Sequence, residues 1–417
     1  MSLLLKTSLK VGGLFLGLFL IAWIVLSAYV YTHKEEILKA VTSQLNEDLN
    51  GTLTIKRMEP SLIRGFPGIS VSLEDVLLRD SLWLVHKHDL LRAKNVYVAI
   101  NAFSILSGSA SIKDIELKGA EIYLLTDSLG VRNTEIFKKK KPSEDKGGIS
   151  KRISRIQLKD VKLTIDDQQK HKLFKFSIIN FKGSIKQKIG GWEGNVKSLT
   201  QVDFFAFNLK RGSFLKGKLL DLDLDMKYSE KTGQLAIPMQ EIMIDKDDLI
   251  IGGNLNFSTD NTDYLIEIQA PSILFKDAKS LLSSHIISKL QPYDVKKPLE
   301  VHAYLSGKFK QGGDPLIKVN FKANDNILST RGETITDCSF TGIYTNERKK
   351  GLPRKDPNSL VAFYNLAGNF YDIPFKADSI QITDLRNPVF TGKFKAGFQL
   401  EKLNKIFGGN TFEFTAG

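Results

Sequence analysis

Apolar and polar residues alternate along much of the chain beyond residue 51. In LLDLDLDMKY, residues 219–228, the even-numbered residues are apolar and the odd-numbered residues from 221 to 225 are aspartate. Side chains two apart on a strand lie on one face, so this alternation is typical of a strand with one buried face. Similar segments at 96–100, 264–268 and 317–323, separated by Gly or Asn-Asp turns, predict an extended antiparallel sheet. Helical patterns are short, and the clearest covers 277–290.

The three aspartates of this segment do not form the pattern of a metal site. On a strand, Asp221, Asp223 and Asp225 would be separated by roughly 6.6 Å per step, too far to share an ion held at about 2.3–2.6 Å. A calcium loop counted from Asp221 needs Gly at its sixth position and a carboxylate at its twelfth. Met226 and Thr232 stand there instead. The aspartates are therefore expected to form the solvent face of a strand.

A ten-residue pattern recurs three times in the first half of the chain, at 71–80, 115–124 and 156–165. In each copy the apolar residues are spaced by two, then three, then two positions. The wider step predicts a β-bulge that keeps the apolar side chains on one face. The recurrence predicts a sheet that is extended by repetition. The residues that mark the wider step are Asp75, Gly119 and Asp160.

The N-terminal region predicts a membrane anchor. Residues 11–32 carry no charge and would span about 33 Å as a helix, against about 30 Å for a bilayer core. Lys6 and Lys10 precede this segment and favour a cytoplasmic N-terminus. A cleaved signal peptide is the alternative, but its apolar region would be only about 7–15 residues long and no A-x-A site is present. Residues 33–50 then have helical spacing and end at Gly51, which predicts an amphipathic helix.

Charge and cysteine content limit the possible partners. The 417 residues carry a net charge of +13, which suits nucleic acid or an anionic membrane surface. With everything after residue 33 outside the cytoplasm, we expect no nucleic-acid partner. The basic runs at 138–141 and 347–355 are expected to be solvated loops, with attraction to anionic headgroups as the alternative. Cys338 is the single cysteine, which excludes an intrachain disulfide and a Cys-rich metal site.

No catalytic constellation is evident. His86, His88 and Asp89 resemble a H-x-H-x-D-H metal motif, but the aspartate comes one position early and a further histidine is missing. No G-x-S-x-G, P-loop or G-x-G-x-x-G sequence precedes an expected helix. We therefore expect a protein that is not an enzyme and that has no metal and no cofactor.

Three features together resemble the AsmA family of Gram-negative envelope proteins. They are the anchor, the helix-Gly-strand entry over 45–80, and the segment 96–133, which contains FSILSG and ends in GVRN. Thr134 follows that Asn where family members often have Trp. The similarity is clear over about residues 1–185 and looser beyond. It implies a mainly β protein with an N-terminal transmembrane helix followed by an extended, curled antiparallel β-sheet groove and a few short helices.

The resemblance also implies a function and a cellular location. Such proteins are similar to bridge-like lipid transfer proteins and are implicated in moving phospholipid between the inner and outer membranes. The expected partners are phospholipid acyl chains and the inner membrane, with the bulk of the single-pass chain in the periplasm. An envelope scaffold that holds other envelope proteins on the same sheet is the alternative. A separate alternative for the structure is that the apolar rows pack on other protein, as in a sandwich, instead of facing lipid.

This interpretation divides the chain into a cytoplasmic tail (1–10), the anchor (11–32), the amphipathic helix (33–50), an N-terminal groove (51–230) and its continuation (231–417), with the helix of 277–290 at the rim or mouth. The chain stops within a strand-like pattern, GGNTFEFTAG, from which we expect a fragment. The residues expected to line the groove are Val71, Leu73, Val76, Leu78, Val96, Val98, Ile100, Ile115, Leu117, Ile122, Leu124, Ile156, Leu158, Val161, Leu163, Leu220, Leu222, Leu224, Met226, Ile266, Ile268, Ile317, Val319 and Phe321.

Overall fold

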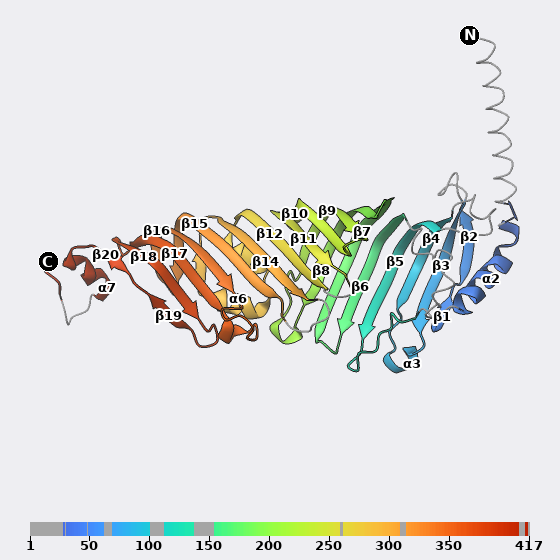
Figure 1. Ribbon diagram of the computed structural model, residues 1–417, viewed down its shortest axis with the longest axis horizontal. Helices are drawn as coiled ribbons and strands as arrows, with labels where there is room; N and C mark the ends of the chain where they lie inside the picture. The colour runs from blue at the N-terminus through green and yellow to red at the C-terminus, as the bar shows by residue number, and fades with distance from the viewer. Residues whose placement is uncertain are drawn as a thin grey trace, which may run out of the picture. The chain divides into compact units, whose positions relative to one another are not determined.

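The computed structural model describes residues 28–415 apart from 30, 48, 62–68, 101–111, 137–153, 259–261, 309–313 and 408–412 (Figure 1). The expected anchor at 11–32 therefore lies almost entirely outside the described residues, as does the basic run at 138–141. None of the helices in the described stretches is both long and apolar enough to cross a bilayer.

The fold is mainly β, and it divides into two compact units. Unit 1 comprises residues 1–169 and 176–185, and unit 2 comprises 170–175 and 186–417. Strand β7 (Lys172–Lys188) has residues in both units. The domain boundaries expected from the sequence stay a prediction. The other elements of unit 1 are α2 (Lys34–Glu47), β1 (Gly51–Thr54), β2 (Arg57–Ser61), β3 (Ile69–Asp80), α3 (Trp83–His86), β4 (Leu91–Ile100), β5 (Ile112–Thr126) and β6 (Arg155–Asp167).

Unit 2 is a succession of antiparallel strands with short helices between some of them. β12 and β14 are neighbours, while the short β13 pairs with the far end of β15. Its elements are β8 (Gly191–Ala206), η3 (Leu209–Arg211), β9 (Lys218–Ser229), β10 (Gln234–Ile244), β11 (Asp247–Asn256), β12 (Asp263–Ile273), α5 (Phe275–Ser280), α6 (Ser284–Leu290), β13 (Tyr293–Val295), β14 (Leu299–Lys308), β15 (Leu316–Thr330), β16 (Glu333–Thr345), η4 (Asp356–Asn358), β17 (Leu360–Phe370), β18 (Ile373–Thr383), β19 (Val389–Gly392), β20 (Lys395–Ala396), η5 (Leu400–Leu403) and α7 (Asn404–Phe407).

One strand pair of unit 1 contradicts the antiparallel expectation. β1 and β2 pair with β3, β3 with β4 and β4 with β5, all antiparallel, but β5 and β6 run parallel. The connection over residues 127–154 is long enough for the crossover that a parallel pair needs, whereas an antiparallel hairpin would need only a short turn. The sheet of unit 1 is therefore mixed.

The positions that mark the wider step in the sequence repeats do have unusual backbone geometry. Asp75, Gly119 and Asp160 have φ angles of 51°, 61° and 54°, in the left-handed region that glycine and aspartate tolerate best. The pairing register is the same on both sides of each position, so no strand carries an extra residue against its neighbour. In place of the expected β-bulge, β3, β5 and β6 each contain one left-handed residue, and the pairing register with the neighbouring strands is unchanged.

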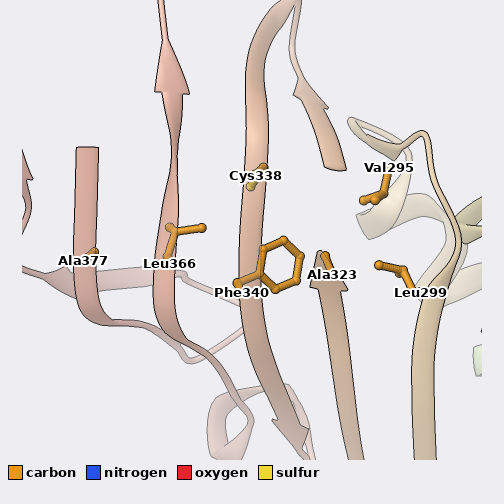
Figure 2. Close-up of a cluster of buried hydrophobic side chains, with 7 residues drawn as sticks. All are labelled: Val295, Leu299, Ala323, Cys338, Phe340, Leu366 and Ala377. Atoms are coloured by element: carbon orange, nitrogen blue, oxygen red, sulfur yellow. The ribbon is translucent and has the colours of Figure 1, made fainter. Parts of the chain in front are cut away.

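Unit 2 uses the same backbone conformation within three consecutive strands. Asp325, Asp337 and Asn365 have φ angles of 43°, 46° and 52°, and the register shifts beside them where β15, β16 and β17 pair. A buried apolar cluster surrounds this region (Figure 2). Burial raises the pKa of the Cys338 thiol to about 11, so this cysteine acts as a small apolar side chain. The cluster consists of Val295, Leu299, Ala323, Cys338, Phe340, Leu366 and Ala377.

Helix α2 packs against β1 and β2 at the start of the sheet, as the amphipathic pattern predicts. Leu38 is buried, and Lys34 Nζ lies 2.9 Å from a carboxylate oxygen of Glu59. The Asn46 side chain accepts a hydrogen bond from the N–H of Leu53 at 2.6 Å and donates to the carbonyl of Leu53 at 3.0 Å. This paired contact fixes the end of the helix to the first strand.

The helix expected over 277–290 is two short helices, α5 and α6. They are separated at residues 281–283, where Ser283 adopts an extended conformation. Serine side chains compete for backbone hydrogen bonds and favour helix ends over helix interiors, which explains the break near Ser283 and Ser284.

Candidate functional site

Strand pairing aligns the apolar residues of unit 1 into rows that cross the sheet. Leu73 of β3 lies opposite Val96 of β4, which lies opposite Leu117 of β5. Leu117 in turn pairs with Leu158 of the parallel strand β6. Three further rows have the same arrangement, so sequence patterns on four strands combine into one apolar face. These rows are Val71–Val98–Ile115–Ile156, Val76–Ala93–Ala120–Val161 and Leu78–Leu91–Ile122–Leu163.

The opposite face of unit 1 is polar. Glu74, Asn95, Lys118 and Lys159 form a matching row on that face. Ion pairs join neighbouring strands there, including Arg57 with Glu74 at 3.1 Å. The sheet is thus apolar on one side and charged on the other, as expected for a sheet whose second side is solvated.

Most of the apolar side chains in these rows are only partly buried. Val76, Val96 and Val161 are buried, and they form a cluster with Ala93, Ala120 and Ile178. The side chains around that cluster keep part of their surface accessible, and Ile156 is 38% exposed. A packed second layer would bury them fully. The apolar face of unit 1 therefore keeps accessible apolar surface that no second layer covers. The partly buried residues that pack on the cluster include Leu73, Val98, Ile115, Leu117, Ile122, Leu158 and Leu163.

Unit 2 contains longer rows of the same kind. Ile268 and Val319, both expected to line the groove, belong to one row, and Phe321 belongs to a second. Ile266 and Ile317 lie in a third row, on either side of Leu305. The first row is Ile251–Ile268–Ala303–Val319–Tyr344–Val361–Ile382–Phe390, and the second is Val301–Phe321–Gly342–Phe363–Ile380.

A glycine in the second row makes room for aromatic packing. Phe321 and Phe363 lie on either side of Gly342, with ring centroids 5.8 Å apart and planes at 79°. A Cβ atom at position 342 would overlap the ring of Phe321. Phe340 completes the cluster, 5.3 Å from Phe363. This edge-to-face packing is favourable for aromatic rings, and its sequence signal is only an isolated Gly within a strand pattern.

Strand β9 has the two faces that its alternation predicts. Residues 220, 222, 224 and 226 are partly buried, whereas the three aspartates are exposed. Asn195 Nδ2 of β8 donates to Asp223 at 3.0 Å and to Asp225 at 2.9 Å, and Lys197 Nζ donates to Asp223 at 2.7 Å. The hydrogen bonds from Lys197 and Asn195 lower the pKa of Asp223. Lys197 of the neighbouring strand therefore neutralises Asp223, and Asn195 links Asp223 to Asp225.

The apolar face of β8 contains one polar pair that its sequence does not reveal. Ser198 and Thr200 lie opposite Leu222 and Leu220, and both are buried. Their hydroxyl oxygens are 2.8 Å apart, so the two groups hydrogen-bond to each other. This mutual satisfaction explains how two hydroxyls are tolerated on an apolar face.

Helix α5 and its C-cap residue Leu281 lie against the apolar clusters of unit 2. Phe275 packs on the cluster of Figure 2, and Ala278 and Leu281 pack on a second cluster that includes Ile242 and Leu249. Lys246 Nζ lies 3.3 Å from a carboxylate oxygen of Asp277, on the first turn of α5. Helix α5 thus covers part of the apolar surface.

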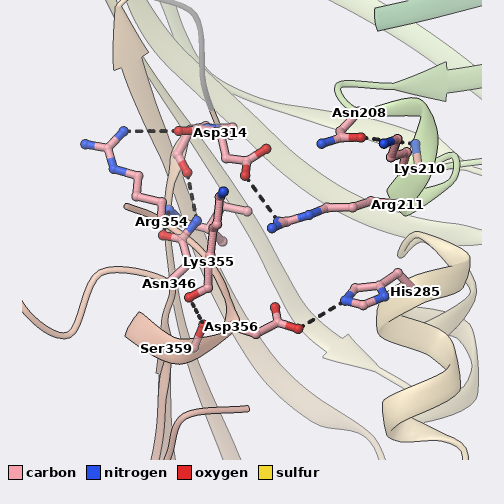
Figure 3. Close-up of polar contacts among 12 residues, drawn as sticks. Asn208, Lys210, Arg211, His285, Asp314, Asn346, Arg354, Lys355, Asp356 and Ser359 are labelled. Carbon is pink, nitrogen blue, oxygen red and sulfur yellow. Dashed lines mark hydrogen bonds and ion pairs between the residues drawn. The ribbon is translucent and has the colours of Figure 1, made fainter. Parts of the chain in front are cut away.

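Polar contacts hold α6 to the loop before β17 (Figure 3). Asp356 forms an ion pair with Lys289 and a hydrogen bond with His285, the latter at 3.2 Å. Lys289 Nζ also donates to the carbonyl of Leu385 at 3.1 Å. Burial by itself would raise the pKa of Asp356, but the hydrogen bonds from Lys289 and His285 outweigh it and lower that pKa. The nearby pair Arg211–Asp314, at 3.2 Å, joins η3 to the segment before β15.

The histidine motif of the sequence is not assembled into a metal site. His86 Nε2 lies 2.9 Å from Asp80, and the His88 ring stacks on Tyr123 with centroids 4.0 Å apart. Asp89 accepts hydrogen bonds from Arg79 and Arg92, each at 2.6 Å. Within the described ranges, no group of three or more His, Cys, Asp or Glu side chains could hold a metal ion.

A cavity of about 350 Å³ with an apolar lining lies near the C-terminal end of unit 2. None of the residues expected to line the groove belongs to this cavity. Part of its lining comes from the ends of β16, β17 and β18, and the rest comes from the short elements that follow β19. Of the expected set, the side chain of Ile100 lies outside the described residues. The cavity is lined by Ile335, Phe370, Ile373, Phe375, Phe394, Ala396, Phe398, Leu403 and Ile406.

Comparison with known proteins identifies a family but no individual relative. A family model described as the AsmA family matches residues 5–243, which is more than half of the chain. No curated protein and no solved structure gives a significant match.

Proposed function

Because the chain belongs to the AsmA family, we propose that its apolar sheet face binds the acyl chains of phospholipids and transports them between the inner and outer membranes, in support of outer-membrane biogenesis. The observation that carries this proposal is the set of apolar rows that cross the strands in register and yet stay partly accessible. Burial of each acyl methylene contributes about 0.8 kcal/mol and requires no particular side chain. A continuous apolar surface without convergent polar groups suits such a ligand.

The proposal includes a location. The uncharged segment 11–32 anchors the chain in the inner membrane with its N-terminus in the cytoplasm, and the β units lie in the periplasm. The protein performs no reaction on the lipid and needs no cofactor, because binding and movement depend on the apolar surface alone.

The function is tested by measuring lipid transfer from donor to acceptor vesicles with the full chain. Leu222→Glu places a charge among acyl chains, where desolvation costs several kcal/mol. We expect this variant to abolish transfer. Asp223→Asn changes the solvated face of the same strand and serves as the matched control, for which we expect transfer close to that of the unchanged chain.

Two results would contradict the proposal. In the first, both variants transfer lipid as well as the unchanged chain does. In the second, both variants lose transfer equally while their far-ultraviolet circular dichroism is unchanged. Capture of an envelope protein by the unchanged chain but not by Leu222→Glu, without any lipid transfer, would favour the scaffold function instead.

A further inference from the structure

The turn between β3 and β4 displays large apolar side chains to solvent. It contains the short helix α3, at the lower edge of unit 1 in Figure 1. Leu84 is 72% exposed and Val85 is 82% exposed, and neither packs on the sheet. Leu129, in the turn that follows β5, is 83% exposed. A soluble surface tolerates single exposed apolar residues, but several of them on neighbouring turns indicate a contact site.

The two turns belong to the same edge of unit 1. Leu91, the first residue of β4, pairs with Ile122 near the end of β5. The N–H of Tyr123 donates to the carbonyl of Leu90 at 3.1 Å, and the His88 ring stacks on the Tyr123 ring. The end of β5 therefore supports the α3 turn directly, and its own turn follows a few residues later.

Internal contacts fix the conformation of both turns. Two cations contact the Trp83 ring, with Arg79 Cζ 3.8 Å and Lys87 Nζ 4.7 Å from ring centroids. In the second turn, Asp127 Oδ1 accepts hydrogen bonds from the N–H groups of Leu129 and Val131, at 2.9 and 2.8 Å. The apolar side chains are thus presented by ordered turns.

At this edge two carboxylates are largely buried, whereas several cations are exposed. The side chains of Asp80 and Asp89 are only 7% and 13% exposed, whereas that of Arg92 is 64% exposed. Burial alone would raise the pKa of Asp89, but hydrogen bonds from Arg92 and Arg79 lower it, so the buried carboxylate stays ionised and paired. Lys87 and Arg132 are exposed as well, and so are the carboxylates Glu121 and Glu135. Exposed cations beside aromatic and aliphatic side chains are typical of segments that enter the headgroup layer of a membrane.

We propose that the edge of unit 1 formed by the α3 turn and the β5 turn inserts into the interfacial layer of an anionic phospholipid membrane. Leu84, Val85 and Leu129 enter the boundary between headgroups and acyl chains. Lys87, Arg92 and Arg132 contact lipid phosphates. This membrane contact is distinct from acyl-chain binding on the sheet face, and it requires no lipid transfer.

The test uses the full chain reconstituted in vesicles that contain an anionic phospholipid. In a Cys338→Ala background, a cysteine introduced at Val85 carries an environment-sensitive fluorophore. Nitroxide-labelled lipid is placed either in the host vesicles or in a second, protein-free population. Thr232→Cys, on the exposed turn between β9 and β10, is the matched control. We expect lipid to quench the label at position 85 but not the label at position 232. Whether quenching occurs with nitroxide in the host vesicles or in the second population identifies which membrane is contacted.

A second variant separates insertion from incidental proximity. Leu84→Asp, made in the chain labelled at position 85, should weaken insertion about tenfold because one leucine no longer leaves water. Its quenching should fall accordingly while unfolding by denaturant stays unchanged. Equal quenching at positions 85 and 232, or emission typical of water at position 85 in both arms, would overturn the proposal. Shielding of position 85 from an aqueous quencher without quenching by lipid would also overturn it, because a protein contact would then cover the turn.

Discussion

Ile115 and Ile156 face each other across the parallel pair β5–β6, at the same offset that relates the two sequence repeats to which they belong. Each following residue of one repeat also meets its counterpart in the other, from Leu117 with Leu158 to Ile122 with Leu163. The repeat therefore places equivalent residues side by side. This is how a short pattern generates a continuous apolar row.

The left-handed positions should be sensitive to β-branched residues. Gly119 has φ +61°, and a Cβ atom added there would have no neighbouring atom closer than 3.5 Å, so the backbone and not a clash limits substitution. Gly119→Val should lower the free energy of unfolding by about 1–2 kcal/mol. Gly119→Asn should lower the free energy of unfolding by less, because asparagine tolerates this backbone conformation. Denaturant unfolding followed by circular dichroism measures both, and equal values would contradict the role assigned to the backbone.

Packing over Gly342 gives a second prediction. Gly342→Ala forces the Phe321 ring to move and should destabilise unit 2 by about 1–3 kcal/mol. Combining it with Phe321→Leu should recover part of that loss, because the smaller side chain relieves the overlap. Gly397→Ala, at a position with open space around it, is the control and should be nearly neutral. If the two single alanine variants unfold at the same denaturant concentration, the proposed overlap is wrong.

The attachment of α6 should weaken in acid. The pKa of Asp356 is lowered in the folded protein, so its contribution to stability is fully present above the unfolded value, near 3.9, and is lost as the pH falls through the folded value. Protonation removes the charge that pairs with Lys289 and His285. The protection of residues 284–290 from hydrogen exchange, taken relative to the intrinsic exchange rate at each pH, should therefore fall below about pH 4.

Asp356→Asn should produce the same loss of protection at neutral pH and reduce its dependence on acid. Asp378→Asn is the matched control, because the Asp378 side chain is 89% exposed although it lies 3.3 Å from Lys395. Unchanged protection of α6 in Asp356→Asn would show that apolar packing by Phe275 and Leu281 suffices to hold the helix pair.

The sequence predicts which face of the sheet a side chain occupies better than it predicts which strands or side chains are neighbours. Alternation in β9 and the two-three-two spacing of the repeats assign side chains to a face, because that assignment depends only on local backbone periodicity. The parallel pairing of β5 with β6 depends on a long connection whose path has no local signature. The buried pair Ser198–Thr200 is likewise invisible in sequence, because each hydroxyl is satisfied only by the other. Transport, membrane anchoring and groove lining remain predictions.

In the proposed groove, the apolar row of β9 faces lipid while its acidic row faces water. A photoreactive amino acid at Leu222, and separately at Asp223, tests this arrangement in the full chain within its native membranes, with the adducts identified by mass spectrometry. Because neighbouring residues of a strand point to opposite faces, the two probes differ in direction and hardly in position. We expect phospholipid adducts at position 222 and none at position 223. Adducts with protein alone at position 222, or equal lipid labelling at both positions, would contradict the lipid-facing role of the apolar row.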